Sequence, residues 1–291
     1  MRFFLGSHMP HWLGELDVSL CINRNRLVKR KTFPRARAPW ALDSGAFTEL
    51  KEHGRWRITA AEYAAEVRRY HDAIGQLVWA GPQDWMCEPW VIFGRNRHLA
   101  PGHRDRFEGT RLARGLEPDD PEQDLTTAVR FHQEQTVANF LELKEIAPDL
   151  PIMPVVQGWT LADYKHCLRL YKRAGIDLAG ELIVGVGSVC RRQATAEVGA
   201  IMTTLADRGL RLHGYGVKAL GIAAYGHLLV SSDSLAWSTG ARYGKRLPGC
   251  THRAAKCQNC PRYALQWRSR IVTTDPGWRQ LALTEPLDTQ A

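Results

Sequence analysis

Short apolar runs recur along the chain, and several are too short and too uniformly apolar to be strands with one exposed face. Such runs are typical of parallel strands that are buried on both faces of a sheet. The runs are residues 3–6, 18–22, 40–42, 77–81, 152–156, 182–186, 212–217 and 228–231. We therefore expect about eight buried strands.

Helical segments lie between the later runs. The first expected helix, 60–74, follows a capping box of Thr59 and Glu62, and the second, 125–146, follows Asp124. The third, 161–174, follows Thr160 and ends at Gly175. The fourth runs from Thr195 to about Arg208 and ends at Gly209. This alternation predicts an α/β fold, a (β/α)8 TIM barrel. An open doubly wound sheet is the alternative, but no G-x-G-x-x-G motif follows the first strand.

Three segments depart from the alternation. Residues 90–121 are irregular and rich in Arg, and we interpret them as a loop inserted into a barrel of residues 1–243. Residues 244–270 contain a cysteine cluster and form a C-terminal extension. Residues 271–291 have the composition of a polar tail.

Composition narrows the class of protein. Of the 291 residues, 44% are hydrophobic and 24% charged, as in soluble globular proteins. No apolar run approaches the roughly 18 residues of a membrane span, and the apolar start is too short for a signal peptide. The seven cysteines are an odd number, which favours reduced thiols in a cytoplasm over a disulfide framework. These features exclude a membrane protein, a secreted mini-protein and a disordered chain.

The positive charge is concentrated in three segments. The net charge is +9, and residues 24–37, 95–114 and 242–270 hold 21 of the 39 Lys and Arg residues. The rest of the chain is acidic. A polarised basic surface of this kind favours a nucleic-acid partner, because a phosphate backbone binds clustered Lys and Arg.

Polar side chains follow the carboxyl ends of several predicted strands. These ends meet at one end of a barrel, where barrel enzymes carry their chemistry. The residues are Asp43 and Ser44, Gln83 and Asp84, Gln157, Gly187 and Ser188, and Asp233 and Ser234. Two carboxylates in one pocket can divide nucleophilic and acid/base work, as in retaining glycosyl transfer. A third carboxylate and an amide can bind the polar edge of a purine.

Four motifs resemble those of the tRNA-guanine transglycosylases, in matching order across residues 40–265. Residues 43–47 (Asp-Ser-Gly-Ala-Phe) are similar to their Asp-Ser-Gly-Gly-aromatic motif, and 155–158 (Val-Val-Gln-Gly) to their Val-Gln-Gly-Gly. Residues 214–217 resemble the stretch before their nucleophile strand, and Asp233 falls where their nucleophile lies. The Phe-Leu-Gly start, the Gly-Val-Gly-Ser strand end and the closing Cys-x-x-Cys resemble the DNA-guanine transglycosylases of phages and bacteria, which exchange guanine in DNA for a 7-deazaguanine.

The resemblance implies a set of roles. Asp233 would attack the sugar C1′ and expel guanine, and Asp43 would take a proton from the incoming base, such as 7-cyano-7-deazaguanine. The residues implied to hold the base are Asp84, Gln157 and the backbone of Gly185 and Gly187 at its polar edges, with Phe47 and Tyr215 stacked on its faces. The implied partners are DNA, the free base and helper proteins that open or present DNA, in a bacterial host cytoplasm if the gene belongs to a phage.

Some residues depart from the pattern of the tRNA enzymes. Trp159 replaces the second Gly after Gln157, and Lys218 stands where the tRNA enzymes have Gly. The alternatives are the same chemistry on tRNA, a non-catalytic zinc-containing protein that binds nucleic acid, and a glycosidase that uses water. DNA is favoured over tRNA because nothing after residue 270 has the pattern of a folded RNA-binding module.

The extension carries four soft metal ligands within eleven residues. They are Cys250, His252, Cys257 and Cys260. Zn²⁺ prefers such tetrahedral Cys/His sets, and a closed set of four protein ligands is structural. The tRNA enzymes place their His after the cysteines, whereas no His follows His252 here, so a histidine ligand is His252 or comes from upstream. We predict one structural zinc.

Overall fold

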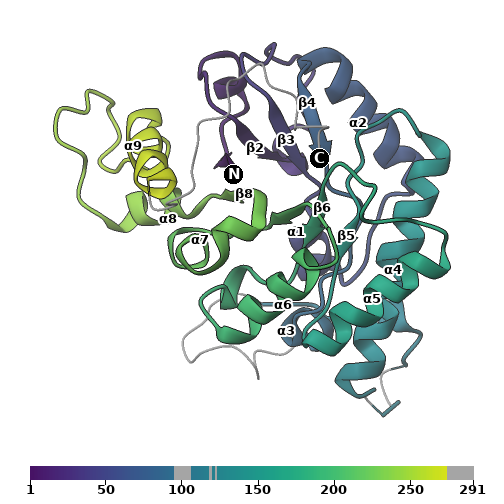
Figure 1. The fold of residues 1–291 in the computed structure, drawn as a ribbon. Helices are drawn as coiled ribbons and strands as arrows, with labels where there is room; N and C mark the ends of the chain where they lie inside the picture. The colour runs from purple at the N-terminus through teal and green to yellow at the C-terminus, as the bar shows by residue number, and fades with distance from the viewer. Residues whose placement is uncertain (95–105, 118–119, 122, 274–291) are drawn as a thin grey trace.

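The computed structural model describes residues 1–94, 106–117, 120–121 and 123–273. Its strands are β1 (Arg2–Ser7), β2 (Leu20–Asn23), β3 (Trp40–Asp43), β4 (Leu77–Ala80), β5 (Val155–Val156), β6 (Val184–Val186), β7 (Leu212–Gly214) and β8 (Leu229–Ser234). They form one eight-stranded sheet in the order β4-β3-β2-β1-β8-β7-β6-β5, with every paired neighbour parallel (Figure 1). Each predicted apolar run overlaps one of these strands.

The two ends of the strand order approach each other just before β5. Ala80 at the end of β4 makes a parallel bridge with Ile152. The Ala80 N–H donates to the Pro151 carbonyl at 2.8 Å, and the Met153 N–H donates to the Ala80 carbonyl at 2.9 Å. This curled parallel sheet is compatible with a TIM-like fold.

The helices are α1 (Ala46–His53), α2 (Ala60–Ile74), α3 (Pro89–Phe93), α4 (Leu125–Ile146), α5 (Leu161–Arg173), α6 (Ala196–Ala206), α7 (Ala219–Tyr225), α8 (Ala236–Tyr243) and α9 (Pro261–Val272). Four of them begin directly after the predicted caps, because the side chains of Thr59, Asp124, Thr160 and Thr195 each accept a first-turn backbone N–H. The first two crossovers differ from the expected pattern and hold only short 3₁₀ helices, Pro10–Gly14 and Arg24–Arg26. Those segments lack a long run of helical apolar periodicity.

The interior of the curled sheet is filled by its own apolar cluster, separate from the larger core between strands and helices. The inner cluster consists of Phe4, Cys21, Ala41, Trp79, Met153, Val155 and Ile183. Residues of this cluster come from six different strands or strand ends, so the interior is packed rather than open. The packed interior supports the polar groups at the carboxyl ends of the strands.

The start of the predicted tail needs correction, and the predicted insertion is described only in part. Helix α9 extends through Val272 and buries Ile271 and Val272 to 5% and 4% exposure, so the helix covers the first residues of the predicted tail. Their apolar side chains pack on the core cluster, which holds the helix to this point. The predicted insertion contains α3 and a buried Phe107, while residues 95–105, 118–119 and 274–291 lie outside the described part of the chain.

No helix in the described part of the chain combines the length and hydropathy that crossing a bilayer requires.

Candidate active site

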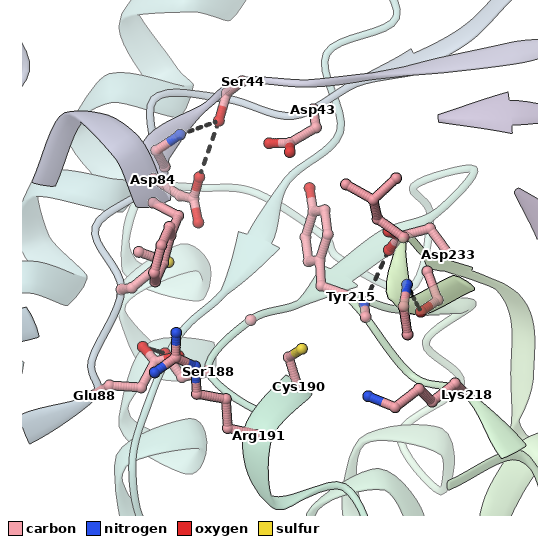
Figure 2. A pocket seen from close by; sticks show the side chains of 18 of the residues that line it. Asp43, Ser44, Asp84, Glu88, Ser188, Cys190, Arg191, Tyr215, Lys218 and Asp233 are labelled. Atoms are coloured by element: carbon pink, nitrogen blue, oxygen red, sulfur yellow. Dashed lines mark hydrogen bonds between the residues drawn. The ribbon is translucent and has the colours of Figure 1, made fainter. Parts of the chain in front are cut away.

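A cavity of about 510 Å³ lies at the carboxyl ends of the strands. Its lining includes carboxylates, polar groups and aromatic rings, namely Asp43, Ser44, Phe47, Asp84, Glu88, Gln157, Gly187, Ser188, Tyr215 and Asp233 (Figure 2). It also includes the basic residues His8, Arg191, Lys218 and Arg242. The fold therefore brings three predicted carboxylates and the predicted amide to one cavity. Gln157 and Asp84 are buried polar residues of this lining.

Asp233 comes from β8 and keeps one oxygen open. Its Oδ1 accepts the Gly216 N–H at 2.9 Å, and the Nε2 atom of His213 lies 3.4 Å from the same oxygen. Within the described residues, Oδ2 has no hydrogen-bond donor. The side chain lines the cavity and is 17% exposed, so an electrophile in the cavity can reach the carboxylate.

His213 is a buried neighbour of Asp233 that sequence analysis missed. It lies on β7 in the barrel interior, with its Nδ1 atom 2.8 Å from the Ser231 hydroxyl and its ring 4.5 Å from the Trp79 ring. The apolar run at 212–217 predicted only a strand. A strand buried on both faces gives no alternation that would mark His213 as pointing inward.

Asp43 comes from the end of β3, and both of its oxygens are held. Oδ2 accepts from the Asn23 amide at 2.7 Å, and Oδ1 accepts the Gly45 N–H at 2.9 Å. Gly45 has φ of +82°, a conformation that favours glycine. Burial raises the pKa of the Asp43 carboxyl, the charge of Asp233 acts in the same direction, and the two hydrogen bonds oppose the shift.

Asp84 and Gln157 form a hydrogen-bonded pair. The Gln157 Nε2 group donates to Asp84 Oδ2 at 2.6 Å, and the Ser44 hydroxyl lies 3.4 Å from Asp84 Oδ1. Burial raises the pKa of Asp84 to about 7, and the hydrogen bond from Gln157 opposes that shift. A Cβ atom at Gly187 would lie 2.2 Å from Gln157 Nε2, so only glycine allows the amide to take this place.

Glu88 and Ser188 extend this pair along the same wall, and sequence analysis assigned neither of them a role in the site. The Ser188 hydroxyl lies 2.7 Å from Glu88 Oε2 and 2.8 Å from Gln157 Oε1. The Glu88 side chain precedes α3, beside the predicted insertion, and is 7% exposed. The only feature of the sequence that could have indicated a role for either residue was the position of Ser188 at a strand end.

The predicted base-stacking and backbone residues divide into two groups. Phe47 and Gly187 line the cavity, as does Tyr215. Gly185 does not line it, because the Tyr215 ring covers it so closely that a Cβ atom would lie 2.8 Å from Tyr215 Cε2. The Gly185 N–H already donates to the Pro154 carbonyl at 2.9 Å and the Gly187 N–H to the Val156 carbonyl at 3.0 Å, so neither backbone N–H is open to a base.

Some residues of the predicted basic segments lie at or near the cavity, and others do not. Arg26 and Arg242 lie close enough to His8 to lower its pKa, after the larger effect of burial. Arg24 is instead buried, with its Nε atom 2.5 Å from Glu66 and its guanidinium 3.7 Å from Glu49. It therefore stabilises the fold and does not contribute to a surface for phosphates.

The four predicted metal ligands converge. One ligand atom from each of Cys250, His252, Cys257 and Cys260 lies within 4.8 Å of the others. The sulfur of Cys250 is 3.6 Å from that of Cys260 and 3.9 Å from that of Cys257. A tetrahedral zinc with Zn–S bonds of about 2.3 Å requires S···S separations of about 3.8 Å, so the residues fit the ion.

The histidine of this cluster is oriented for metal binding. His252 Nδ1 lies 3.0 Å from the Ala254 carbonyl, which leaves Nε2, 3.3 Å from Cys257 Sγ, for an ion. A second nitrogen held by a carbonyl is the usual arrangement of a zinc-binding histidine. Cys260 is also the N-cap residue of α9, so a bound zinc would fix the start of that helix.

Zinc should copurify at about one ion per chain. Cys257→Ser should lower both the zinc content and the thermal unfolding midpoint, because the ligand set and the start of α9 depend on the same ion. Elemental analysis and thermal denaturation measure the two effects. Cys190→Ser, at an exposed thiol outside the cluster, is the matched control and should keep its zinc. Freshly purified wild-type protein without zinc would refute the site.

Fold and site together define a TIM-like α/β protein with a carboxylate and amide cavity and a Cys3His cluster. The sequence matches the DpdA family model, described as DeoxyPurine in DNA protein A, over residues 1–106 and 116–286, and the chain belongs to this family. This match confirms the resemblance to the DNA-guanine transglycosylase branch. No curated protein sequence matches the chain. The family indicates a role in deoxypurine modification of DNA.

Proposed function

We propose that the protein exchanges guanine in DNA for a 7-deazaguanine, such as 7-cyano-7-deazaguanine, through a covalent intermediate on Asp233. The observation that carries the proposal is that Asp43 and Asp233 share one cavity with the Asp84 and Gln157 pair. The first two supply the reactive carboxylates of a double displacement. The pair supplies a buried polar surface for a purine edge.

In the first displacement, Asp233 Oδ2 attacks C1′ of the target deoxyribose. The C1′–O bond forms as the C1′–N9 bond breaks, and guanine leaves with the electron pair of that bond. The Gly216 N–H, 2.9 Å from Oδ1, holds the carboxylate in place. Asp43, whose pKa is raised by burial, can carry the proton that the departing base takes up.

In the second displacement, N9 of the incoming base attacks C1′ and expels the Asp233 carboxylate. Asp43 accepts the N9 proton, which restores the starting protonation state. Two inversions at C1′ give net retention of configuration. During both steps ionised Asp84 accepts from the N1–H and the amino group of the base, while Gln157 provides a further polar contact.

DNA is the proposed polymer, and the charge around the cavity supports it. Arg191, Lys218 and Arg242 line a cavity whose buried groups are carboxylates, so phosphates would bind at the opening and the neutral base would enter. The target nucleotide must leave its stack to reach Asp233, which costs least in single-stranded DNA. Helper proteins that open or present duplex DNA would remove that cost.

Labelled guanine tests the reaction and the polymer together. The protein should incorporate label into single-stranded DNA faster than into duplex DNA, and into either faster than into tRNA, at low salt. Raising the salt concentration should weaken DNA binding steeply, because bound phosphates release their counterions. Label entering tRNA but neither form of DNA would overturn the proposed polymer. If the product is abasic DNA without incorporated label, the reaction is hydrolysis and not base exchange.

A further inference from the structure

Four buried side chains form a continuous hydrogen-bonded row along one wall of the cavity. The row runs from Asp84 through Gln157 and Ser188 to Glu88, with exposed fractions of 7%, 0%, 6% and 7%. Figure 2 shows Asp84, Ser188 and Glu88 on the side of the cavity opposite Asp233. In the proposed exchange Asp84 and Gln157 bind the base, whereas Ser188 and Glu88 have no role.

The number of hydrogens in the row restricts how it can be bonded. The Ser188 oxygen accepts the Cys87 N–H at 2.8 Å, and its single hydrogen faces two acceptors, Glu88 Oε2 at 2.7 Å and Gln157 Oε1 at 2.8 Å. If Glu88 carries a proton, it donates to Ser188, which donates to Gln157 Oε1. Gln157 Nε2 then donates to Asp84, and every group in the row has a partner.

An ionised Glu88 would break this order. The Ser188 hydrogen would then bond to the carboxylate, and the oxygens of Ser188 and Gln157 would face each other at 2.8 Å without a hydrogen between them. The amide would have to rotate and place its oxygen against Asp84. Such an arrangement leaves buried polar atoms unpaired, which is costly.

The backbone around Ser188 is built for this contact. Ser188 has φ of +55°, a left-handed conformation that a residue other than glycine rarely adopts. The neighbouring Gly187 leaves no room for a Cβ atom beside the Gln157 amide. The chain therefore accepts local strain at Ser188 and a bare backbone at Gly187 to hold the two side chains in contact.

We propose that Glu88 is a positioning residue that donates a hydrogen bond to Ser188 and thereby fixes which end of the Gln157 amide faces Asp84 and the base. The inference rests on the proposed base site. It makes recognition of a guanine-type edge depend on a carboxyl group at the far end of the row from Asp84.

Several charged or titratable groups face Glu88 and influence its proton. Burial raises the pKa of the Glu88 carboxyl, while the Ser188 hydrogen bond and the guanidinium groups of Arg191 and Arg192 lower it. The thiols of Cys87 and Cys190 and the hydroxyl of Tyr164 also lie near enough to interact with its charge. The donor form of Glu88 is present at low pH and is lost as pH rises through this raised pKa.

Ionisation has opposite effects at the two ends of the row. It removes the donor form of Glu88, but it creates the acceptor form of Asp84. Its carboxyl, with a pKa of about 7, must ionise to accept from the base, so base affinity should rise as pH rises through that value. Wild-type affinity for guanine should therefore pass through a maximum. Binding requires ionised Asp84 together with protonated Glu88, so the fall in affinity toward high pH depends on the ionisation of Glu88.

The test is the equilibrium affinity of the full chain for free guanine across pH, in the wild type, Glu88→Gln and Glu88→Leu. Glu88→Gln keeps a hydrogen donor at every pH, so it should keep the acidic limb and lose the first alkaline limb. Glu88→Leu removes the donor and should bind guanine about 10- to 100-fold more weakly near the wild-type optimum. Thermal midpoints show whether each variant folds.

The outcomes separate this inference from the proposed function. Guanine binding with the same alkaline limb in the wild type and Glu88→Gln, or with wild-type affinity in Glu88→Leu, would overturn the role of Glu88 alone. If the wild type binds no guanine at any pH, the base site itself is refuted, and the role of Glu88 is refuted with it. Should Glu88→Leu not fold, the pH profile of Glu88→Gln decides.

Discussion

Asp233→Asn should abolish base exchange, with a loss on the order of 10⁴-fold or more, as expected when a covalent nucleophile is removed. The reason is that Asp233 lines the cavity, and its Oδ1 is held by the Gly216 N–H at 2.9 Å while Oδ2 has no hydrogen-bond donor among the described residues. An amide keeps an acceptor for Gly216 but cannot attack C1′. Incorporation of labelled guanine into single-stranded DNA measures the loss.

The fold should survive this substitution. Asp233 is partly exposed, and its described hydrogen bond needs only one acceptor oxygen. Asp207→Asn is the matched control, because Asp207 is an exposed carboxylate at the end of α6 and does not line the cavity. Exchange at the wild-type rate in Asp233→Asn would mean that the nucleophile is a different group.

Asp43→Asn should slow exchange by about 10²- to 10⁴-fold, the usual contribution of a positioned acid or base. Both displacements should slow, because neither the departing guanine nor the incoming base then has a carboxyl group to exchange its N9 proton with. The wild-type rate should fall as pH rises through the pKa of Asp43, which burial raises, because the departing guanine takes up the proton of that carboxyl, and the variant should lack that limb. Single-turnover rates across pH measure both effects.

A folding control is needed for Asp43→Asn. Both carboxylate oxygens accept hydrogen bonds, from Asn23 and from Gly45, so an amide places its NH₂ group against one of two donors. The thermal midpoint should therefore be compared with those of the wild type and Asp207→Asn. A folded Asp43→Asn protein that keeps the wild-type rate and pH profile would rule out the acid/base role.

Local signals allowed much of the fold to be predicted. Caps such as Thr59 and Asp124 mark helix starts because a first-turn N–H needs a nearby side-chain acceptor, whatever the tertiary structure. The apolar runs marked the strands because a strand that is buried on both faces is apolar along its whole length. The metal cluster was equally accessible, since its four ligands lie within one short segment.

Features that depend on distant parts of the chain could not be predicted. Arg24 falls in a basic segment, but Glu66, 42 residues away, pairs with it in the interior. Glu88 and Ser188, 100 residues apart, meet only in the folded chain. Gly185 was assigned to the base by the family resemblance, whereas the ring of Tyr215, which follows the neighbouring strand β7, covers it.

The most direct test of a covalent exchange on DNA is mass spectrometry of the wild-type protein, acid-quenched during reaction with single-stranded DNA and guanine, then digested with protease and nuclease. The account predicts a deoxyribosyl ester on the peptide that contains Asp233, and no such ester in Asp233→Asn. An adduct on another residue, or incorporation of labelled guanine with no adduct at any time point, would contradict it.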